Sequence, residues 1–382
     1  ERRDAYDSLS VPVYNTLAYE FDNAAVMAEA FTDKIKAPDY SRVENPTVTN
    51  LERRVAALTD AVHTTAFNSG MAAISNTLMA LAAQGKNIVT SKHLFGNTYA
   101  LLVATLRRFG VKVRLRDLTN IEAVREAIDD DTCCVFLEIL TNPQLEVADL
   151  KAISEVAHEK NVPLVVDSTV IPFTQFSAKS LGVDIEVVSS SKYVSGGATS
   201  LGGLVIDYGT PYNGDFAKRL YGEMLFNFGA YMTPQVAYMQ TIGLETLDAR
   251  YRVQSSNALE LAKKLRSLPQ IKNVNYVGLE DNPYHELAQR QFGKTAGAMI
   301  CIDLESKEAC FSFLNNLKLI HRATNLFDNR SLAIHPASTI FGAFSESMRK
   351  SMDVKDTTIR LSIGLEDVDD LFEDIKQAVD SL

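Results

Sequence analysis

The sequence predicts an α/β fold, with a large domain built on a mostly parallel sheet and a smaller α+β domain after it. Between residues 46 and 207, amphipathic helical stretches alternate with short runs of apolar, β-branched residues. These runs are apolar on both faces, which is typical of parallel strands that helices cover from both sides. After about residue 235, a long helical stretch precedes shorter strand candidates mixed with helices, and this change of pattern predicts the second domain.

Three amphipathic stretches predict helices in the first part of the large domain. Residues 46–58 place four apolar side chains on one helical stripe. Residues 71–85 repeat this pattern, and Gly85 is expected to act as the C-terminal cap. Residues 97–110 should form a third helix that ends at Gly110. Two shorter helices are expected further along, at residues 121–128 and 150–159.

Apolar runs between these helices predict the strands of the large sheet. They lie at residues 86–91, 111–115, 133–139, 163–167 and 185–189. Because helical segments separate most of these runs, the strands should be parallel and joined by right-handed crossovers.

The two ends of the chain differ from this alternating region. The first 45 residues show little periodicity and resemble an arm laid on a partner. Towards the C-terminus, residues 234–268 predict one long helical stretch, and residues 298–305 and 359–366 are strand candidates. Residues 371–382 form the last expected helix. The expected division is an arm at residues 1–45, a cofactor-binding domain at residues 46–235 and a C-terminal domain at residues 236–382.

Composition argues against several classes of protein. The 382 residues include 38 basic and 48 acidic side chains, and the net charge of −10 argues against a nucleic-acid partner. No run approaches the ~18 consecutive apolar residues that a membrane span needs. The four cysteines lack CxxC spacing and are expected to be reduced, as in a cytoplasmic protein. The six histidines show no paired spacing, so no metal site is expected.

The most informative stretch places a lysine beside a serine-rich strand end. It runs from residue 183 to residue 207 and reads VDIEVVSSSKYVSGGATSLGGLVID. Hydroxyls and free backbone amides after a strand favour a phosphate or an oxyanion, and Lys192 could form an imine with an aldehyde cofactor. A dinucleotide-binding loop would stand directly before a helix, whereas this glycine-rich segment leads into another apolar run, which argues against that kind of loop. The alternative is a surface lysine in an ordinary Ser/Gly turn.

Two further fragments point to pyridoxal phosphate (PLP), an aldehyde cofactor with a pyridine ring. Asp167 ends a predicted strand at the edge of the sheet where ligands collect, and it could pair with a protonated pyridine nitrogen. Ser69, Gly70 and Met71 lie at a predicted helix N-terminus, where free N–H groups favour a phosphate. Viewed alone, Asp167 and Ser69 could equally be ordinary helix caps or turn residues.

Together these fragments resemble a known family, the Cys/Met-metabolism PLP-dependent enzymes. Its members include cystathionine γ-synthase, cystathionine γ- and β-lyases, methionine γ-lyase and O-acetylhomoserine sulfhydrylase. The resemblance rests on motifs that occur in order along almost the whole chain. These are YSRVENPT (40–47), SGM (69–71), LFGNTY (94–99), TNP (141–143), VVDST (165–169), SSSKYVSG (189–196), IHPAS (334–338) and IRLSIGLED (359–367).

The resemblance implies the aspartate-aminotransferase-like fold called fold type I, with a seven-stranded large sheet. It also implies a homotetramer assembled as a dimer of dimers, in which Tyr40 and Arg42 reach the cofactor phosphate of the neighbouring subunit. Within one chain, the phosphate would be held by Ser69, Gly70, Met71, Ser189 and Ser191.

The same resemblance assigns roles around the cofactor ring and the substrate. Lys192 would form the imine with PLP and later move protons, and Asp167 would keep the ring nitrogen protonated. Asn142 would bond the ring oxygen, and Phe95 would stack on the ring. The substrate carboxylate would be bound by Arg360 and Asn325.

Departures from the family pattern bear on the reaction. Phe95 replaces the usual tyrosine, and Asn97 stands where methionine γ-lyases carry a cysteine. Ser168 replaces a common asparagine, and Ile340-Phe341 replaces a frequent Thr-His pair.

These departures favour γ-replacement, in which O-acetyl-L-homoserine and a sulfide donor give L-homocysteine and acetate, a step of methionine biosynthesis. A lyase that eliminates from methionine or cystathionine is the alternative, and a non-catalytic relative is the third possibility. The sulfur donor stays open among free sulfide, a thiol and the thiocarboxylate of a carrier protein.

Overall fold

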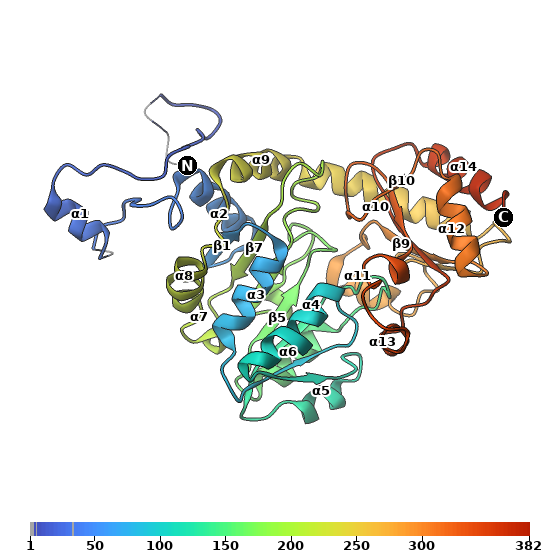
Figure 1. Ribbon diagram of the computed structural model, residues 1–382, viewed down its shortest axis with the longest axis horizontal. Helices are drawn as coiled ribbons and strands as arrows, with labels where there is room; N and C mark the ends of the chain where they lie inside the picture. The colour runs from blue at the N-terminus through green and yellow to red at the C-terminus, as the bar shows by residue number, and fades with distance from the viewer. Residues whose placement is uncertain (1–3, 5, 33) are drawn as a thin grey trace.

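The computed structural model describes residue 4, residues 6–32 and residues 34–382, and it contains two sheets flanked by helices (Figure 1). The predicted arm therefore falls partly outside the described residues, at residues 1–3, 5 and 33. The described part of the arm contains the short helix α1 (Ala24–Ala30), which projects away from the rest of the chain (Figure 1). The expected α/β fold of type I is confirmed, with the large sheet first and the small sheet second.

The large sheet has seven strands in the order β1-β7-β6-β5-β4-β2-β3. Pairing is parallel from β6 to β3, and β7 runs antiparallel to both of its neighbours. Each apolar run expected to be a strand is one. The strands are β1 (His63–Phe67), β2 (Asn87–Thr90), β3 (Lys112–Leu115), β4 (Thr132–Glu138), β5 (Leu164–Asp167), β6 (Ile185–Val188) and β7 (Gly203–Asp207).

Helices cover both faces of this sheet, which explains why its central strands are apolar on both faces along most of their length. Along β4, Val135 and Leu137 pack into one core together with α2 (Pro46–Thr59) and α6 (Leu150–His158). Cys134 and Phe136 point to the opposite core, against α3 (Gly70–Leu81). The other helices of this region are α4 (Gly96–Ala100), α5 (Ile121–Ala127), α7 (Phe216–Arg219) and α8 (Phe226–Phe228).

Two helices differ from their predicted ends. The helix α3 ends at Leu81 because Ala82 is extended, with φ −82° and ψ 152°. Gly85 is consequently not its cap, and its positive φ of 86° belongs to the turn that leads into β2. The predicted helix over 97–110 is regular only as far as Ala100, and a wider and then a tighter turn follow before Gly110 ends it with φ 78°.

The C-terminal region carries a five-stranded sheet in the order β10-β11-β12-β9-β8. The predicted helical stretch 234–268 is two helices that meet at Thr246. The strands are β8 (Asn273–Asn275), β9 (Met299–Asp303), β10 (His321–Arg322), β11 (Leu332–Ile334) and β12 (Thr358–Ser362). The helices are α9 (Pro234–Glu245), α10 (Leu247–Leu265), α11 (His285–Phe292), α12 (Lys307–Asn316), α13 (Glu346–Ser351) and α14 (Val368–Val379).

The expected domain boundaries near residues 45 and 235 stay a prediction. All four cysteines are free thiols. Over the described residues, no helix combines the length and the apolar character that a membrane crossing requires.

Candidate active site

Most of the predicted site residues meet in one cavity of about 520 Å³ at the carboxyl ends of β4, β5 and β6. Ligands of parallel α/β sheets collect at this edge. The predicted residues that line the cavity are Ser69, Gly70, Met71, Phe95, Asn142, Asp167, Ser189, Ser191, Lys192 and Arg360. Asn325 joins them through a hydrogen bond that it accepts from Lys192. The structure thus brings together residues from both sheets of the chain.

One end of the cavity is an anion cradle at the N-terminus of α3. Ser69 caps this helix, and its Oγ accepts a hydrogen bond of 3.1 Å from the backbone N of Ala72. A Cβ at Gly70 would lie 2.6 Å from the Cβ of Ser189, so only glycine fits at this position. Ser191 is fixed on the same side, where its Oγ accepts a bond of 2.9 Å from the backbone N of Gly202. Free N–H groups and serine hydroxyls therefore converge as a phosphate requires.

The close approach of Gly70 to Ser189 leads to a prediction about the affinity for the cofactor. In Gly70→Ala the new methyl group must displace Ser189, and overpacking of this kind costs about 1–3 kcal/mol. We expect the affinity for PLP, measured by titrating the visible absorbance, to fall at least about tenfold. Gly222→Ala is the matched control, because a Cβ there meets no atom within 4 Å. Equal affinities in the two variants would contradict the cradle.

Lys192 lies beside this cradle with its amine held by a single bond. Its Nζ donates to Asn325 Oδ1 over 2.8 Å. Burial, together with the nearby positive charge of Arg360, lowers the pKa of Lys192 to about 8. A minority of the Lys192 amine, far larger than for an ordinary lysine, is therefore neutral close to physiological pH, and the neutral amine is the form that attacks an aldehyde.

Asp167 lies at the end of β5, next to a carboxylate that sequence reasoning missed. Glu138 pairs in register with Asp167 across β4 and β5 and lines the same cavity. The backbone N of Phe95 donates to Glu138 Oε1. Burial, reinforced by the charge of Asp167, raises the pKa of Glu138 to about 8, and burial also raises the pKa of Asp167. With Glu138 protonated, the negative charge rests on Asp167, where a pyridinium nitrogen would be stabilised.

Ser168, one of the departures from the family pattern, is fully buried and points to a third acid. Its Oγ donates to Glu186 of β6, and the hydroxyl of Tyr208 donates to the other oxygen of that carboxylate over 2.6 Å. Burial raises the pKa of Glu186 to about 7. Ser168 therefore serves a buried hydrogen-bond network rather than the cavity.

Arg360 supplies a cation to the same cavity. Its side chain is almost fully buried, and burial lowers its pKa to about 10. Nη1 donates to Asn142 Oδ1 over 3.3 Å, and Nη2 donates to the backbone oxygen of Asn325 over 3.2 Å. Among the described residues its Nε has no hydrogen-bond partner. A buried guanidinium with a donor to spare fits an incoming carboxylate.

Tyr40 and Arg42 do not line the cavity of their own chain. Tyr40 pairs with Ala18 in an isolated β-bridge, and the Arg42 guanidinium lies 5.5 Å from the Tyr40 ring. Arg42 also donates to the backbone oxygen of Phe226, the first residue of α8. Their expected role in a neighbouring subunit stays a prediction.

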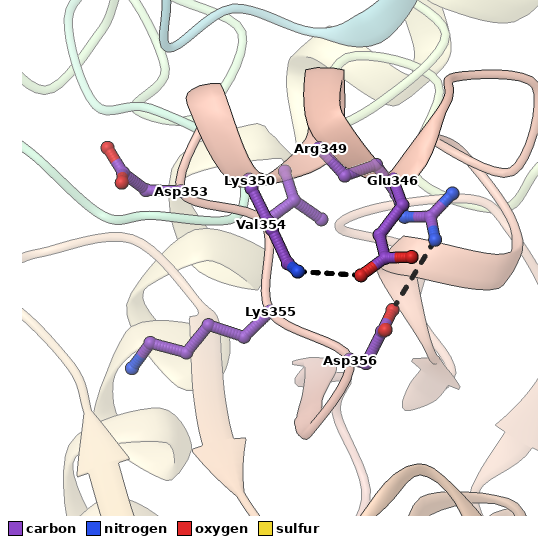
Figure 2. Close-up of a pocket in the computed structure, with 7 residues that line it drawn as sticks. All are labelled: Glu346, Arg349, Lys350, Asp353, Val354, Lys355 and Asp356. Carbon is purple, nitrogen blue, oxygen red and sulfur yellow. Dashed lines mark ion pairs between the residues drawn. The ribbon is translucent and has the colours of Figure 1, made fainter.

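A second hollow, of about 300 Å³, lies beside α13 (Figure 2). Lys350 pairs with Glu346 over 2.6 Å, and Arg349 lies 3.8 Å from Asp356. The remaining charges of this hollow pair with neighbours outside it, so the hollow offers a ligand no uncompensated charge. Within the described part of the chain, no group of His, Cys, Asp and Glu could hold a metal ion.

The large cavity fits PLP in three respects that the structure itself provides. It has a lysine whose pKa is lowered, an acid at a strand end for a ring nitrogen, and an anion cradle where only glycine fits. The unpartnered donor of Arg360 leaves a place for the carboxylate of an amino acid. The shape and the charges thus suit the cofactor and an amino-acid substrate together.

Comparison with known proteins agrees with this fit. The family model of the Cys/Met metabolism PLP-dependent enzymes matches residues 1–380. An L-methionine gamma-lyase of Fusobacterium nucleatum subsp. polymorphum is 37% identical and covers 100% of this chain and 95% of its own length. A putative O-acetylhomoserine (thiol)-lyase of Campylobacter jejuni, solved with a pyridoxyl-lysine monophosphate, has a TM-score of 0.95 at 34% identity, over 100% of this chain and 97% of that chain. The O-acetylhomoserine sulfhydrylase of Wolinella succinogenes has a TM-score of 0.79 at 43% identity, over 88% and 96%.

Proposed function

Because this chain belongs to the Cys/Met metabolism PLP-dependent enzymes, we propose that it exchanges the acetate of O-acetyl-L-homoserine for sulfide. The products are L-homocysteine and acetate. The PLP dependence belongs to the whole family, whereas the choice of reaction is our inference. It rests on one observation, the chemistry of the cavity wall that faces the substrate side chain.

That wall is apolar where a proton donor would be needed to expel a thiol. Phe95, Asn97 and Ile340 line it. A phenyl ring and an alkyl chain donate no proton, and an amide is a poor acid. Acetate leaves as a weak base and needs no such help, whereas methanethiolate does. The wall thus favours substrates that carry a good leaving group.

Arg360 binds and orients the substrate in this proposal. Its free Nε, with the two Nη groups fixed by Asn142 and Asn325, directs the guanidinium at the substrate carboxylate. This grip holds the α carbon near Lys192, and fixing two reacting groups in this way removes a large entropic barrier. When bound, PLP supplies the electron sink for carbanion chemistry.

Lys192 moves the protons. Its neutral amine takes the α proton of the substrate and later delivers a proton back, for which a pKa near the working pH is the best compromise. Asp167 holds the proton of the ring nitrogen, and Glu138 keeps the backbone of Phe95 in place beside it.

The lyase alternative has its own support, since a methionine gamma-lyase is 37% identical over the full chain. The proposal is tested by assaying the purified holoenzyme with O-acetylhomoserine, O-succinylhomoserine, cystathionine and methionine, each with and without sulfide. Methionine cleavage as the fastest reaction would favour the lyase. Sulfide, a thiol and a carrier-protein thiocarboxylate should be compared as sulfur donors in the same assay.

The role of Lys192 makes a separate prediction. The purified protein should be yellow, with an absorption band near ~420 nm, as expected of an imine between lysine and PLP. Borohydride should fix the cofactor to the chain, and peptide mapping should find it on Lys192. An adduct on another lysine would overturn the assignment, whatever the activity.

A further inference from the structure

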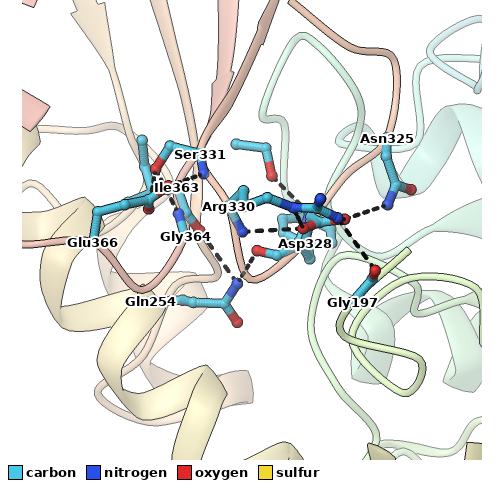
Figure 3. A network of polar contacts seen from close by, with 11 residues as sticks. Gly197, Gln254, Asn325, Asp328, Arg330, Ser331, Ile363, Gly364 and Glu366 are labelled. Atoms are coloured by element: carbon cyan, nitrogen blue, oxygen red, sulfur yellow. Dashed lines mark hydrogen bonds and ion pairs between the residues drawn. The ribbon is translucent and has the colours of Figure 1, made fainter. Parts of the chain in front are cut away.

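The amide of Asn325 is oriented by a buried carboxylate behind it. Asn325 Nδ2 donates to Asp328 Oδ2 over 3.3 Å (Figure 3), and Asn325 Oδ1 accepts from Lys192 Nζ. An ionised carboxylate only accepts hydrogen bonds, so it must face the NH₂ side of the amide. The oxygen of Asn325 is then left to face Lys192. The orientation of this amide follows from the charge of Asp328.

Asp328 is itself held in one position. It is 2% exposed, and its oxygens accept bonds from Arg330, through Nε over 2.8 Å and Nη2 over 3.2 Å. These bonds and the Arg330 charge outweigh burial and lower the pKa of Asp328, so that it stays ionised. Gln254 fixes the backbone oxygen of Asp328 over 2.7 Å (Figure 3).

The loop that carries these residues is anchored to the turn after Lys192. The backbone N of Asn329 donates to Gly196 over 2.7 Å, and Arg330 Nη2 donates to the oxygen of Gly197 over 3.2 Å. Phe327 stacks on Tyr193, which follows Lys192 directly, with ring centroids 4.1 Å apart. Phe327 adopts a positive φ of 55°, a strained conformation for a bulky residue that persists only where the surroundings impose it.

We propose that Asp328 is a positioning residue that acts through Asn325, whose Oδ1 holds one N–H of the Lys192 amine and so directs the nitrogen lone pair. In the steps in which this amine is free, the fixed N–H leaves the lone pair turned away from Asn325 and available for the α proton. The main role of Asn325 is then to orient Lys192, and Arg360 binds the substrate carboxylate. This inference rests on the proposed role of Lys192 but not on the leaving group.

A partial reaction without a leaving group isolates this step. With L-norleucine in D₂O, Lys192 takes the α proton, which breaks the C–H bond and forms an N–H bond. The amine exchanges its hydrogens with solvent and returns a deuteron to the same carbon, and a bound PLP would supply the electron sink in between. Proton NMR measures the exchange rate at saturation, and the absorbance change of the holoenzyme gives the dissociation constant.

Asp328→Asn keeps the shape but allows the Asn325 amide to turn. A small misplacement of a reacting group can cost about 10²-fold, and we expect exchange at saturation to slow at least about tenfold, with a dissociation constant within about threefold of wild type. Asn325→Ala should slow it similarly, and the double variant should be no slower, because one residue acts through the other. Asp374→Asn is the control, since this buried carboxylate does not line the cavity and, among the described residues, accepts bonds from backbone N–H groups and from Gln377.

A readout independent of turnover accompanies these rates. The holoenzyme saturated with L-norleucine is treated with an amine-acylating reagent over a range of pH, and the label on Lys192 is quantified by peptide mapping. A hydrogen-bond acceptor that faces the amine stabilises its protonated form. The pH at which labelling of Lys192 is half-maximal should therefore be lower in Asp328→Asn and Asn325→Ala than in wild type. It should be unchanged in Asp374→Asn. Weaker norleucine binding with unchanged exchange, additive losses in the double variant, or an unmoved midpoint would each overturn the inference. If borohydride mapping places the cofactor on another lysine, the role of Lys192 fails instead.

Discussion

A mixture of Lys192→Ala and Arg42→Ala subunits should recover about a quarter of wild-type activity, although neither variant alone is substantially active. Each site is expected to combine Lys192 of one chain with Tyr40 and Arg42 of its neighbour. Random exchange makes half of the dimers mixed, and each mixed dimer holds one intact site of two. Loss of Lys192 removes the group that moves protons and should cost about 10²–10⁴-fold or more. Loss of Arg42 removes a charged hydrogen bond to the phosphate, worth about 1.5–3 kcal/mol. The assay must therefore use a limiting concentration of PLP, so that sites without Arg42 stay largely empty.

The structure of one chain motivates this experiment. Arg42 lies outside its own cavity and close to α8, near the end of the arm and after the projecting helix α1 (Figure 1). The matched control mixes Lys192→Ala with Asp167→Ala, because both residues line the cavity of the same chain and no intact site can form. Recovery in the control, or none in the test mixture after subunit exchange is verified, would refute the shared site. We also expect the wild-type protein to sediment as a homotetramer.

The fold could be predicted because its signals are local. The strands β4 and β5 are buried apolar runs, and amphipathic helices separate them, so period and composition alone specify the layers. The ends of the helices were harder to predict from the sequence. The break at Thr246 and the end of α3 at Leu81 involve no proline or glycine at the break itself, and tertiary packing decides them.

The site was predictable where a motif carries its chemistry. Lys192, Asp167 and Gly70 meet as expected, because the carboxyl ends of parallel strands share one edge. Glu138 was missed, although a single acid within the apolar run CCVFLEIL was a usable signal, since a buried carboxylate needs a reason. The contact of Asn325 with Lys192 could not be predicted, because it joins residues 133 positions apart, in loops that follow strands of different sheets.

The last prediction concerns the choice of reaction. Sulfide-dependent formation of homocysteine from O-acetylhomoserine should exceed methionine γ-elimination at least about 10²-fold in kcat/KM. The reason is the missing proton donor on the wall formed by Phe95 and Asn97. Tyr99 carries a hydroxyl close to these residues in sequence. Its ring, however, packs edge-on against Phe344, with centroids 6.0 Å apart, and does not line the cavity.

Two substitutions separate these explanations. Phe95→Tyr restores a hydroxyl beside the cofactor and should raise methionine elimination about tenfold or more, with little effect on the acetate ester, since only the thiolate needs a proton. Tyr99→Phe is the matched control, because it removes one hydroxyl from a residue that does not line the cavity, and it should leave both reactions unchanged. If Tyr99→Phe abolishes methionine cleavage, Tyr99 is the acid after all. If wild-type kcat/KM values for methionine and O-acetylhomoserine are comparable, the wall does not select the leaving group, and the lyase becomes the better assignment.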